Sequence, residues 1–219
     1  MSSGRFKQDL YGQLARVARA IGHPNRLELL EYIAQGSRPV DELAAMTRLS
    51  VANASKHLQD LRQAGLVRAR KEGVRVYYEL AGPDVVDLLS AVRIVGETRL
   101  AEVEQLVRTY IDARDDLEPV PVDEVLRRAR QGLVTVLDVR PPEEYAAGHL
   151  PGAVNIAADS LAGHLKSLPR GREVVAYCRG PYCLLSVDAV AFLRERGYKA
   201  RRLENGFPEW KAAGLPVET

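Results

Sequence analysis

The sequence has few cysteines, no long apolar run and almost no net charge, and each absence excludes a class of protein. Only two cysteines occur among 219 residues, which excludes a disulfide framework and indicates a reducing compartment. The first 20 residues carry charges throughout, so they lack the apolar segment of a signal peptide. No later stretch stays apolar for the roughly 18 residues that a membrane-spanning helix needs. We therefore expect a cytoplasmic protein without a membrane partner.

The charges are unevenly distributed although the net charge is only +2. Residues 48–75 contain seven Lys or Arg against two acidic residues, a local net charge of +5. Residues 76–118 contain four Arg against ten acidic residues, a local net charge of −6. A basic block beside an acidic block indicates a binding partner rather than a fold, although two solvated faces would carry the same charges.

A short acidic segment with two prolines, residues 115–121, divides the chain. Pro119 and Pro121 push their neighbours out of helical geometry. The pattern is helical before this segment and alternates strands with helices after it. We therefore predict two domains, residues 1–114 and residues 119–219. Each has a length typical of a single domain.

The first part predicts a mainly α domain with a helix-turn-helix and a β wing. Apolar spacing predicts helices over 9–21, from about Asn25 to Gly36, over 40–46 and over 51–63, the last with Ser50 as N-cap. Two strands, 66–70 and 74–80, surround a glycine-containing turn and carry several Lys and Arg, as a wing along the phosphate backbone would.

The helix over 51–63 turns Leu58 and Leu61 inward, which leaves polar side chains facing out. Such side chains read base edges and phosphates. The residues that we predict to contact DNA are Ser50, Asn53, Ser55, Lys56, Gln59, Arg68, Arg70, Lys71 and Arg75.

Residues 49–67 resemble the recognition helix of ArsR-type winged-helix repressors, and residues 22–27 resemble that family's stretch between its first two helices. The similarity covers roughly residues 8–112. It implies a homodimer whose two recognition helices enter successive major grooves of double-stranded operator DNA with a near-palindromic sequence.

An apolar stripe over residues 84–111 supports dimerisation independently of the resemblance. A continuous helix of about 28 residues would span roughly 40 Å, too long for one small domain to cover, so we expect a partner helix there. The alternative is that this helix packs on the second domain. The stripe consists of Val85, Leu88, Leu89, Val92, Val95, Leu100, Val103, Leu106, Val107 and Tyr110.

Members of this family often sense metal ions, yet the first domain has only two residues of the types that soft ions prefer, His23 and His57. We expect His23 to structure a helix start, and His57 to face DNA or the flank of its helix. We therefore predict no metal site and no cofactor, and we expect the signal to enter elsewhere.

The second part predicts an α/β domain with a parallel sheet and helices on both faces. Ligands bind such sheets beyond the carboxyl ends of the strands, and Cys178 follows directly on the apolar strand 173–177. A helix begins near Leu184, so backbone N–H groups converge on the loop 178–183 and favour a thiolate at Cys178. Arg179 adds a positive charge that should lower the pKa of this thiol.

Residues 138–144 with 148–153 resemble the first rhodanese signature, and residues 206–210 with 214–217 resemble the second. The similarity covers about residues 119–218. It implies that Cys178 carries a persulfide cradled by the loop that contains Gly180, Pro181 and Tyr182. We expect Asp138, Arg140 and His149 to be scaffold, and Trp210 to be core.

The loop departs from the family pattern at its end. Sulfurtransferases of this fold usually have a basic or hydroxyl residue at the sixth loop position, where this sequence has Cys183. Related phosphatases and arsenate reductases have arginine at the seventh position, where this sequence has Leu184, so we discount oxyanion chemistry. Cys183 is either a resolving thiol that attacks the modified Cys178 or a buried residue that never reacts.

The leading hypothesis is a transcriptional repressor that responds to sulfur. Its second domain would accept sulfane sulfur from thiosulfate, a persulfide or a polysulfide on Cys178 and thereby change the affinity of the dimer for its operator. The alternative is an active sulfurtransferase that DNA binding merely localises, with slow turnover expected because of Cys183. In a third hypothesis the second domain is an inert dimer clamp.

Overall fold

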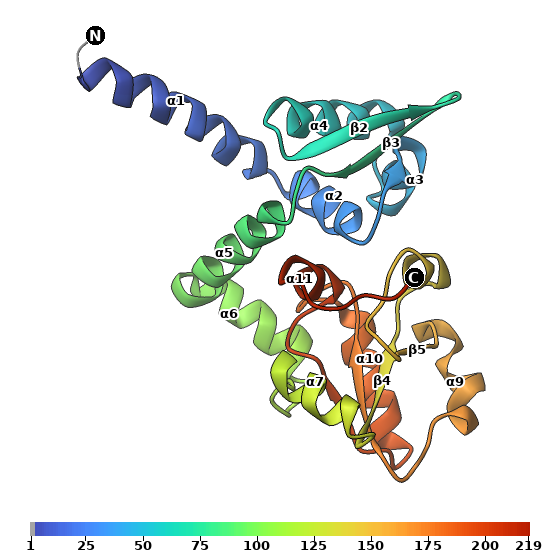
Figure 1. Cartoon of the computed structure of the whole chain (residues 1–219). Coiled ribbons are helices and arrows are strands. Elements are labelled where there is room, and N and C mark those ends of the chain that lie inside the picture. Colours follow the sequence, from blue (N-terminus) through green and yellow to red (C-terminus); the bar gives the residue numbers. More distant parts are fainter. Residues whose placement is uncertain (1–2) are drawn as a thin grey trace. The chain divides into compact units, whose positions relative to one another are not determined.

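The computed structural model describes residues 3–219, which form two compact units. The first unit ends at Leu89 and the second runs from Ser90 to Thr219 (Figure 1). Helix α5 therefore begins in the first unit and ends in the second. The elements up to α5 are α1 (Ser3–Ile21), α2 (Pro24–Ala34), β1 (Arg38–Pro39), α3 (Val40–Met46), α4 (Val51–Gln63), β2 (Val67–Glu72), β3 (Arg75–Leu80) and α5 (Asp84–Arg99).

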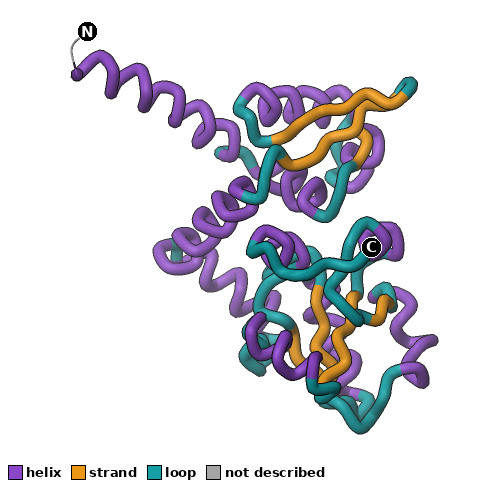
Figure 2. Tube along the Cα trace, in the orientation of Figure 1, coloured by secondary structure: helices purple, strands orange, loops and turns teal. Residues whose placement is uncertain are grey.

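The first unit is the predicted mainly α domain with a wing. Strands β2 and β3 form an antiparallel hairpin, and the short strand β1 pairs with the other edge of β3 (Figure 2). The core packs Leu29 and Leu30 of α2 against Leu58 and Leu61 of α4, and the inward direction of the two α4 leucines is as predicted. Ser50 caps α4 as predicted, because its hydroxyl accepts a hydrogen bond from the Asn53 N–H at 3.2 Å.

The prediction of one unbroken helix over 84–111 is wrong. Helix α5 ends at Arg99, Leu100 has extended backbone angles, and a shorter helix follows. The hydroxyl of Thr98 bonds back to the Ile94 carbonyl at 2.8 Å, a pattern that competes with regular helix and bends it. Acidic residues Glu102 and Glu104 then suit the start of a new helix. Residues 84–111 therefore do not form the long rod on which the expected partner helix depended.

The acidic segment 115–121 belongs to the second unit. The Asp115 side chain is buried and forms ion pairs with Arg194, at 2.8 Å, and with Arg202. Val120 is buried and bridges to Leu203 beside the sheet. The units separate earlier, within α5, while the domain limits at residues 114 and 119 remain predictions.

The second unit is built on a four-stranded sheet whose strands are all parallel, in the order β5-β4-β6-β7 (Figure 2). This confirms the predicted α/β class. Its elements after α5 are α6 (Ala101–Val107), a π-helical turn η1 (Arg108–Asp112), α7 (Val122–Arg130), β4 (Val134–Asp138), α8 (Pro142–Ala146), β5 (Val154–Asn155), η2 (Ala158–Ser160), α9 (Leu161–His164), η3 (Leu165–Ser167), β6 (Glu173–Tyr177), α10 (Leu184–Glu195), β7 (Ala200–Arg202) and α11 (Phe207–Ala212).

Both faces of this sheet are buried, which explains why β6 reads as a continuous apolar run. Val174 and Ala176 face the core beneath α9 and α10, together with Cys178. Val175 and Tyr177 face the opposite core, which also contains Phe207 and Trp210 of α11. Alternation along the strand thus places Cys178 on the α10 side and Tyr177 on the α11 side. Within residues 3–219, no helix is both long and apolar enough to cross a membrane.

A buried carboxylate holds the carboxyl ends of β4 and β6 together. Asp138, fully buried, accepts hydrogen bonds from Nη2 of Arg140 at 2.6 Å and from the Tyr177 hydroxyl at 2.5 Å. Arg140 also donates to the Gly148 carbonyl at 2.8 Å. Burial alone would lower the pKa of Arg140, but its hydrogen bonds to Asp138 and the Asp138 charge outweigh burial and raise it.

Replacing this carboxylate should destabilise the second unit strongly. We expect Asp138→Ala to lower its free energy of unfolding by about 3–5 kcal/mol, because the buried guanidinium of Arg140 would lose the carboxylate that binds it at 2.6 Å. The single tryptophan, Trp210, lies in this unit and reports its urea unfolding by fluorescence. Asp159→Ala, at an exposed position, is the matched control and should leave the midpoint unchanged.

Candidate functional site

The two cysteines occupy the two ends of one short loop. Cys178 follows β6 directly, and Cys183 immediately precedes α10, so the loop lies at the carboxyl edge of the parallel sheet. The sulfur atoms are joined as a disulfide, and the two Cα atoms lie 6.1 Å apart. Both residues are buried, with 2% of Cys178 and 8% of Cys183 exposed. The expectation that the two thiols can approach each other is therefore confirmed.

The start of α10 supplies the environment expected for an anionic sulfur. The first N–H groups of a helix have no partner within the helix, and the helix dipole favours negative charge there. The side chain of Cys183 caps no amide of α10. The Cys183 N–H donates to the Gly180 carbonyl at 3.1 Å, which closes the loop into a tight turn.

Helix α11 supports the loop from the other side. The Phe207 N–H donates to the Cys178 carbonyl at 3.1 Å. Gly206 lies against the loop backbone so closely that an added Cβ would be 2.5 Å from the Arg179 carbonyl carbon. No real Cβ makes such a contact, so this position requires glycine for space alone. Glu209 accepts from the Gly206 N–H at 3.1 Å, and burial raises the pKa of its carboxyl.

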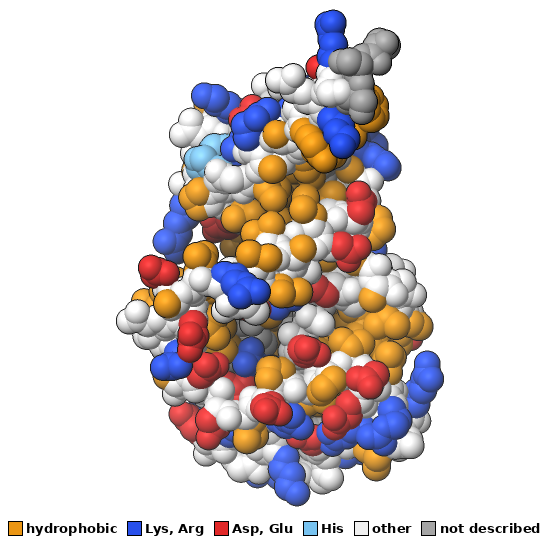
Figure 3. All heavy atoms as spheres, turned by 90° about the vertical axis from the view of Figure 1, so that its left-hand side faces the viewer, with side chains coloured by type: hydrophobic (Ala, Val, Ile, Leu, Met, Phe, Trp, Pro, Cys, Tyr) orange, Lys and Arg blue, Asp and Glu red, His pale blue; other side chains and the backbone are white. Residues whose placement is uncertain are grey.

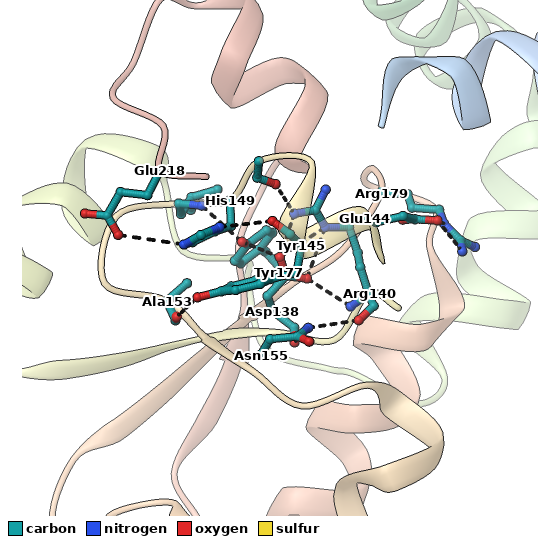
Figure 4. Close-up of polar contacts among 12 residues, drawn as sticks. Asp138, Arg140, Glu144, Tyr145, His149, Ala153, Asn155, Tyr177, Arg179 and Glu218 are labelled. Carbon is teal, nitrogen blue, oxygen red and sulfur yellow. Dashed lines mark hydrogen bonds and ion pairs between the residues drawn. The ribbon is translucent and has the colours of Figure 1, made fainter. Parts of the chain in front are cut away.

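Arg179 does not point into solvent but faces a buried carboxylate. Its Nε and Nη2 donate to the Glu144 carboxylate at 2.8–3.0 Å, a bidentate pair visible in Figure 4. The side chain of Glu144 is fully buried. The negative charge of Glu144 offsets the guanidinium, so the pair anchors the loop to α8. Activation of Cys178 by Arg179 stays a prediction.

The three residues expected to be scaffold lie in one buried network (Figure 4). Asp138 and Arg140 pair as described, and burial, followed by the charge of Asp138, raises the pKa of the Tyr177 hydroxyl. The His149 ring stacks on Tyr145, with centroids 3.6 Å apart, and its Nδ1 lies 3.0 Å from the Tyr145 carbonyl oxygen. Trp210 is buried in the core as expected.

The middle of the loop contacts α5. Tyr182 is 42% exposed, and its hydroxyl donates to Oε1 of Glu97 at 2.7 Å. Burial raises the pKa of Tyr182, and the hydrogen bond to Glu97 raises it further. The Pro181 carbonyl accepts a long hydrogen bond from Arg202 at 3.5 Å. Gly180 lies beside Gly206.

The predicted DNA-contacting residues lie on α4 and on the hairpin of β2 and β3, and all but half-buried Ser55 are exposed. Three of these side chains have partners within the chain. Ser50 caps α4, Arg70 pairs with Glu72, and Arg75 lies 3.4 Å from Asp41. Lys71 pairs with Val76 near the turn of the hairpin.

The two histidines of the first unit lie beside each other. His23 caps α2 through Nδ1, which accepts from the Asn25 N–H at 3.2 Å, so the expected role at a helix start is confirmed. His57 lies on the flank of α4 with its ring 4.5 Å from the His23 ring. Burial, followed by the charges of His23 and Arg26, lowers the pKa of His57. Among residues 3–219, no group of three or more His, Cys, Asp or Glu is arranged to hold a metal ion.

Sequence reasoning missed the residues that hold the loop in place. Glu144 and Gly206 lie inside the two quoted signatures, but only their contacts reveal what they do. Glu97 carried no local signal, because its partner Tyr182 is 85 residues away in the chain. Asp115 read as part of an acidic linker, and its burial depends on two arginines far along the chain.

Comparison with known proteins gives two family matches, one for each predicted domain. Residues 23–69 match the model of the bacterial regulatory proteins of the arsR family. Residues 121–213 match the model of the rhodanese-like domain. Both matches agree with the two resemblances seen in the sequence.

Similar proteins cover the whole chain and each of its parts. The HTH-type transcriptional regulator Rv0324 of Mycobacterium tuberculosis is 44% identical over 212 residues, which is 97% of this chain and 93% of that protein. A sulfurtransferase of Allochromatium vinosum is 33% identical over 85 residues, which is 38% of this chain and 78% of that protein.

Among solved structures, the homodimeric winged helix-turn-helix DNA-binding domain of a possible ArsR-family regulator from Mycobacterium bovis is 41% identical. The match covers 46% of this chain and 91% of that chain, with a TM-score of 0.42. The full-length similarity and the two family matches lead to one conclusion. The chain belongs to the ArsR family of HTH-type transcriptional regulators and carries a C-terminal rhodanese-like domain.

Proposed function

We propose that this transcriptional regulator receives its signal as sulfane sulfur on Cys178 and responds by changing its affinity for operator DNA. The observation that carries the proposal is the disulfide between Cys178 and Cys183 across the loop after β6. Cys183 occupies the position at which a sulfurtransferase of this fold would have a basic or hydroxyl residue. A persulfide formed on Cys178 would therefore lie next to a second thiol. Such a thiol suits a sensor, because it converts the persulfide into a disulfide that lasts until it is reduced.

The chemistry needs no oxidant besides the sulfur donor. The Cys178 thiolate attacks the outer sulfur of a persulfide RSSH, which gives Cys178–SSH and releases the thiolate RS⁻. The Cys183 thiol then attacks Sγ of Cys178, which forms the disulfide and releases hydrogen sulfide with the two remaining protons. The sulfane sulfur is reduced to sulfide while the two thiols are oxidised.

The charges around the loop favour persulfides and polysulfides over oxyanionic donors. Thiosulfate carries two charges on a sulfonate-like group that an arginine or lysine would have to bind. The guanidinium nearest to Cys178 in sequence, that of Arg179, already binds Glu144 bidentately. The donor that suits this loop is therefore an alkyl or inorganic persulfide, with thiosulfate a poorer one.

The output is DNA binding by a homodimer. Helix α4 and the wing expose the predicted base and phosphate contacts, as in a recognition helix flanked by a hairpin. Helix α1 exposes an i, i+4, i+8 apolar stripe of Phe6, Leu10 and Leu14, and α5 exposes Val92 and Val95. Figure 3 shows hydrophobic side chains that gather at the surface among charged ones on one face of the molecule. We assign these apolar residues to the dimer interface.

The alternative function is sulfur transfer, which the similarity to the A. vinosum sulfurtransferase favours. Both functions begin with a persulfide on Cys178 and differ in the fate of its outer sulfur atom. A transferase passes the sulfur to an external acceptor in repeated turnovers, whereas Cys183 ends the cycle with a disulfide. Steady-state turnover with thiosulfate and cyanide separates the two, and a rate near background supports the sensor.

We expect reduced protein to change its operator affinity by about 5–150-fold after polysulfide treatment, the range of typical allosteric coupling. Cys178→Ser should abolish both the response and the mass increase. Cys183→Ser should retain added sulfur on Cys178 without forming the disulfide. Binding titrations at constant salt, with intact-mass measurement of the same samples, test this. Equal affinities before and after verified sulfur uptake would contradict the proposal.

Displacing the loop should impair sulfur uptake. In Gly206→Ala the new methyl group meets the Arg179–Gly180 peptide, so we expect a loss of about 1–3 kcal/mol in stability. We also expect slower persulfide formation on Cys178. Trp210 fluorescence measures the stability and time-resolved mass spectrometry the rate. Gly163→Ala, which has no atom within 4 Å of the new methyl group, is the control, and an equal rate in both variants would contradict this role.

The wing should contribute a purely electrostatic share of DNA binding. Lys71→Gln should weaken binding to operator and unrelated DNA alike and reduce the slope of log K against log salt by about 0.9, the value for one phosphate contact. Fluorescence anisotropy at a series of salt concentrations measures the slope. Lys166→Gln, exposed in the second unit, should leave it unchanged. An unaltered slope in the Lys71 variant would place the wing off the DNA.

A further inference from the structure

We propose that Tyr182 and Glu97 are the positioning residues that couple the cysteine loop to the DNA-binding unit, with Arg202 as a second link. This inference rests on the proposed function and names its regulatory route. Neither residue touches the reacting sulfur atoms in this scheme. Their role is to make the position of α5 depend on whether the two cysteines are joined.

Helix α5 is the element that can transmit such a change. It runs without a break from Asp84 to Arg99. At its start, Val85 is buried in the core of the first unit, in the same cluster as Leu58 and Leu61 of the recognition helix α4. At its end, Glu97 accepts the hydrogen bond from Tyr182. Helix α5 thus has one end in the core of the DNA-binding unit and the other hydrogen-bonded to the cysteine loop.

The contact at the end of α5 is polar and specific. The Tyr182 hydroxyl lies 2.7 Å from Oε1 of Glu97, a charge-assisted hydrogen bond. Arg93, one turn earlier on α5, lies 3.9 Å from the same carboxylate oxygen. The charge of Arg93 also opposes the burial that raises the pKa of Glu209 on α11, the carboxylate that accepts from the Gly206 N–H, and Glu209 lies 3.9 Å from where a Cβ on Gly180 would be. Side chains from α5, the loop and α11 therefore meet at one place.

A second link leads from the loop to the segment after the π-helical turn. Nη1 of Arg202 lies 3.5 Å from the Pro181 carbonyl oxygen, and Nε of the same residue pairs with buried Asp115. Asp115 also pairs with Arg194 of α10 at 2.8 Å. Of the two residues that precede Cys183, Tyr182 is thus bonded to α5, and Pro181 is linked through Arg202 to Asp115 in the segment after η1.

Whether the two cysteines are joined affects the contacts of Tyr182 and Pro181, because Tyr182 is the direct neighbour of Cys183. The disulfide holds the Cα atoms of Cys178 and Cys183 6.1 Å apart. When it opens, or when a sulfur atom is inserted on Cys178, the Cys183 side of the loop must shift and carries Tyr182 with it. A cavity of about 600 Å³ lies beside Tyr182, bounded by Glu97, Ile111 and Arg202, so the ring has room to move. Tight packing of Gly206 against the Arg179–Gly180 peptide leaves no such freedom at the start of the loop.

The test separates sulfur uptake from the response to it. Full-length Tyr182→Phe should take up sulfur on Cys178 at the wild-type rate, yet its sulfur-dependent change in operator affinity should shrink about tenfold, as the loss of one strong hydrogen bond implies. Glu97→Ala should behave the same way. Glu97→Gln should retain most of the response, because its amide oxygen still accepts from the tyrosine hydroxyl. Tyr110→Phe, another exposed tyrosine of this unit, is the matched control.

Each outcome has one meaning. Suppose that Tyr182→Phe and Glu97→Ala take up sulfur normally, as intact mass shows, and still change their operator affinity as much as the wild type does. This result overturns the coupling route but leaves the proposed function intact. A wild-type protein that takes up sulfur without any change in affinity overturns both. Loss of the response in Tyr182→Phe and Glu97→Ala, with retention in Glu97→Gln and Tyr110→Phe, supports the route, since a general loss of structure would not spare the glutamine variant.

Discussion

The hydrogen bond between the Tyr177 hydroxyl and the buried Asp138 carboxylate determines where the cysteine loop begins. Tyr177 is the last residue of β6 and directly precedes Cys178. Because its side chain is bonded to Asp138 on one face of the sheet, the side chain of Cys178 must lie on the opposite face. Arg140 pairs with Asp138 in this buried place and also donates to the Gly148 carbonyl. The reactive end of the sheet therefore rests on a satisfied buried ion pair.

The rest of the loop is held by contacts of three different kinds. Glu144 holds Arg179 by charge, Gly206 permits close backbone approach, and Phe207 donates to the Cys178 carbonyl. These contacts secure the first half of the loop. The second half, from Pro181 to Cys183, instead contacts Arg202 of β7 and Glu97 of α5. The two halves of the loop are thus held by different elements.

The connection between the two parts of the chain is a shared helix. A flexible linker would let each unit act alone, since the ends of a flexible chain transmit little force. Here α5 contributes apolar residues to the core around α4 and a carboxylate to the cysteine loop. Residues 115–121, which read as a linker, are tied to the second unit by Asp115 and Val120. The boundary between the two compact units therefore lies within α5, between the two family matches and before the predicted domain limit at residue 114.

Local patterns in the sequence determined much of this protein. Periodicity, Ser50 as a cap and glycines at turns were enough to predict α4, its inward Leu58 and Leu61, and the wing, because each depends on neighbours within a few residues. The order of strand, cysteine loop and helix was equally readable, since an apolar run followed by Leu184 marks both borders. Only the tertiary structure decided which side chains hold the loop. The pairs Arg179–Glu144, Tyr182–Glu97 and Arg202–Asp115 span 35, 85 and 87 residues, and no spacing rule selects a partner at such distances. The break at Leu100 was equally hidden, because the apolar stripe continues through it and only the backbone of the folded chain departs from the helix.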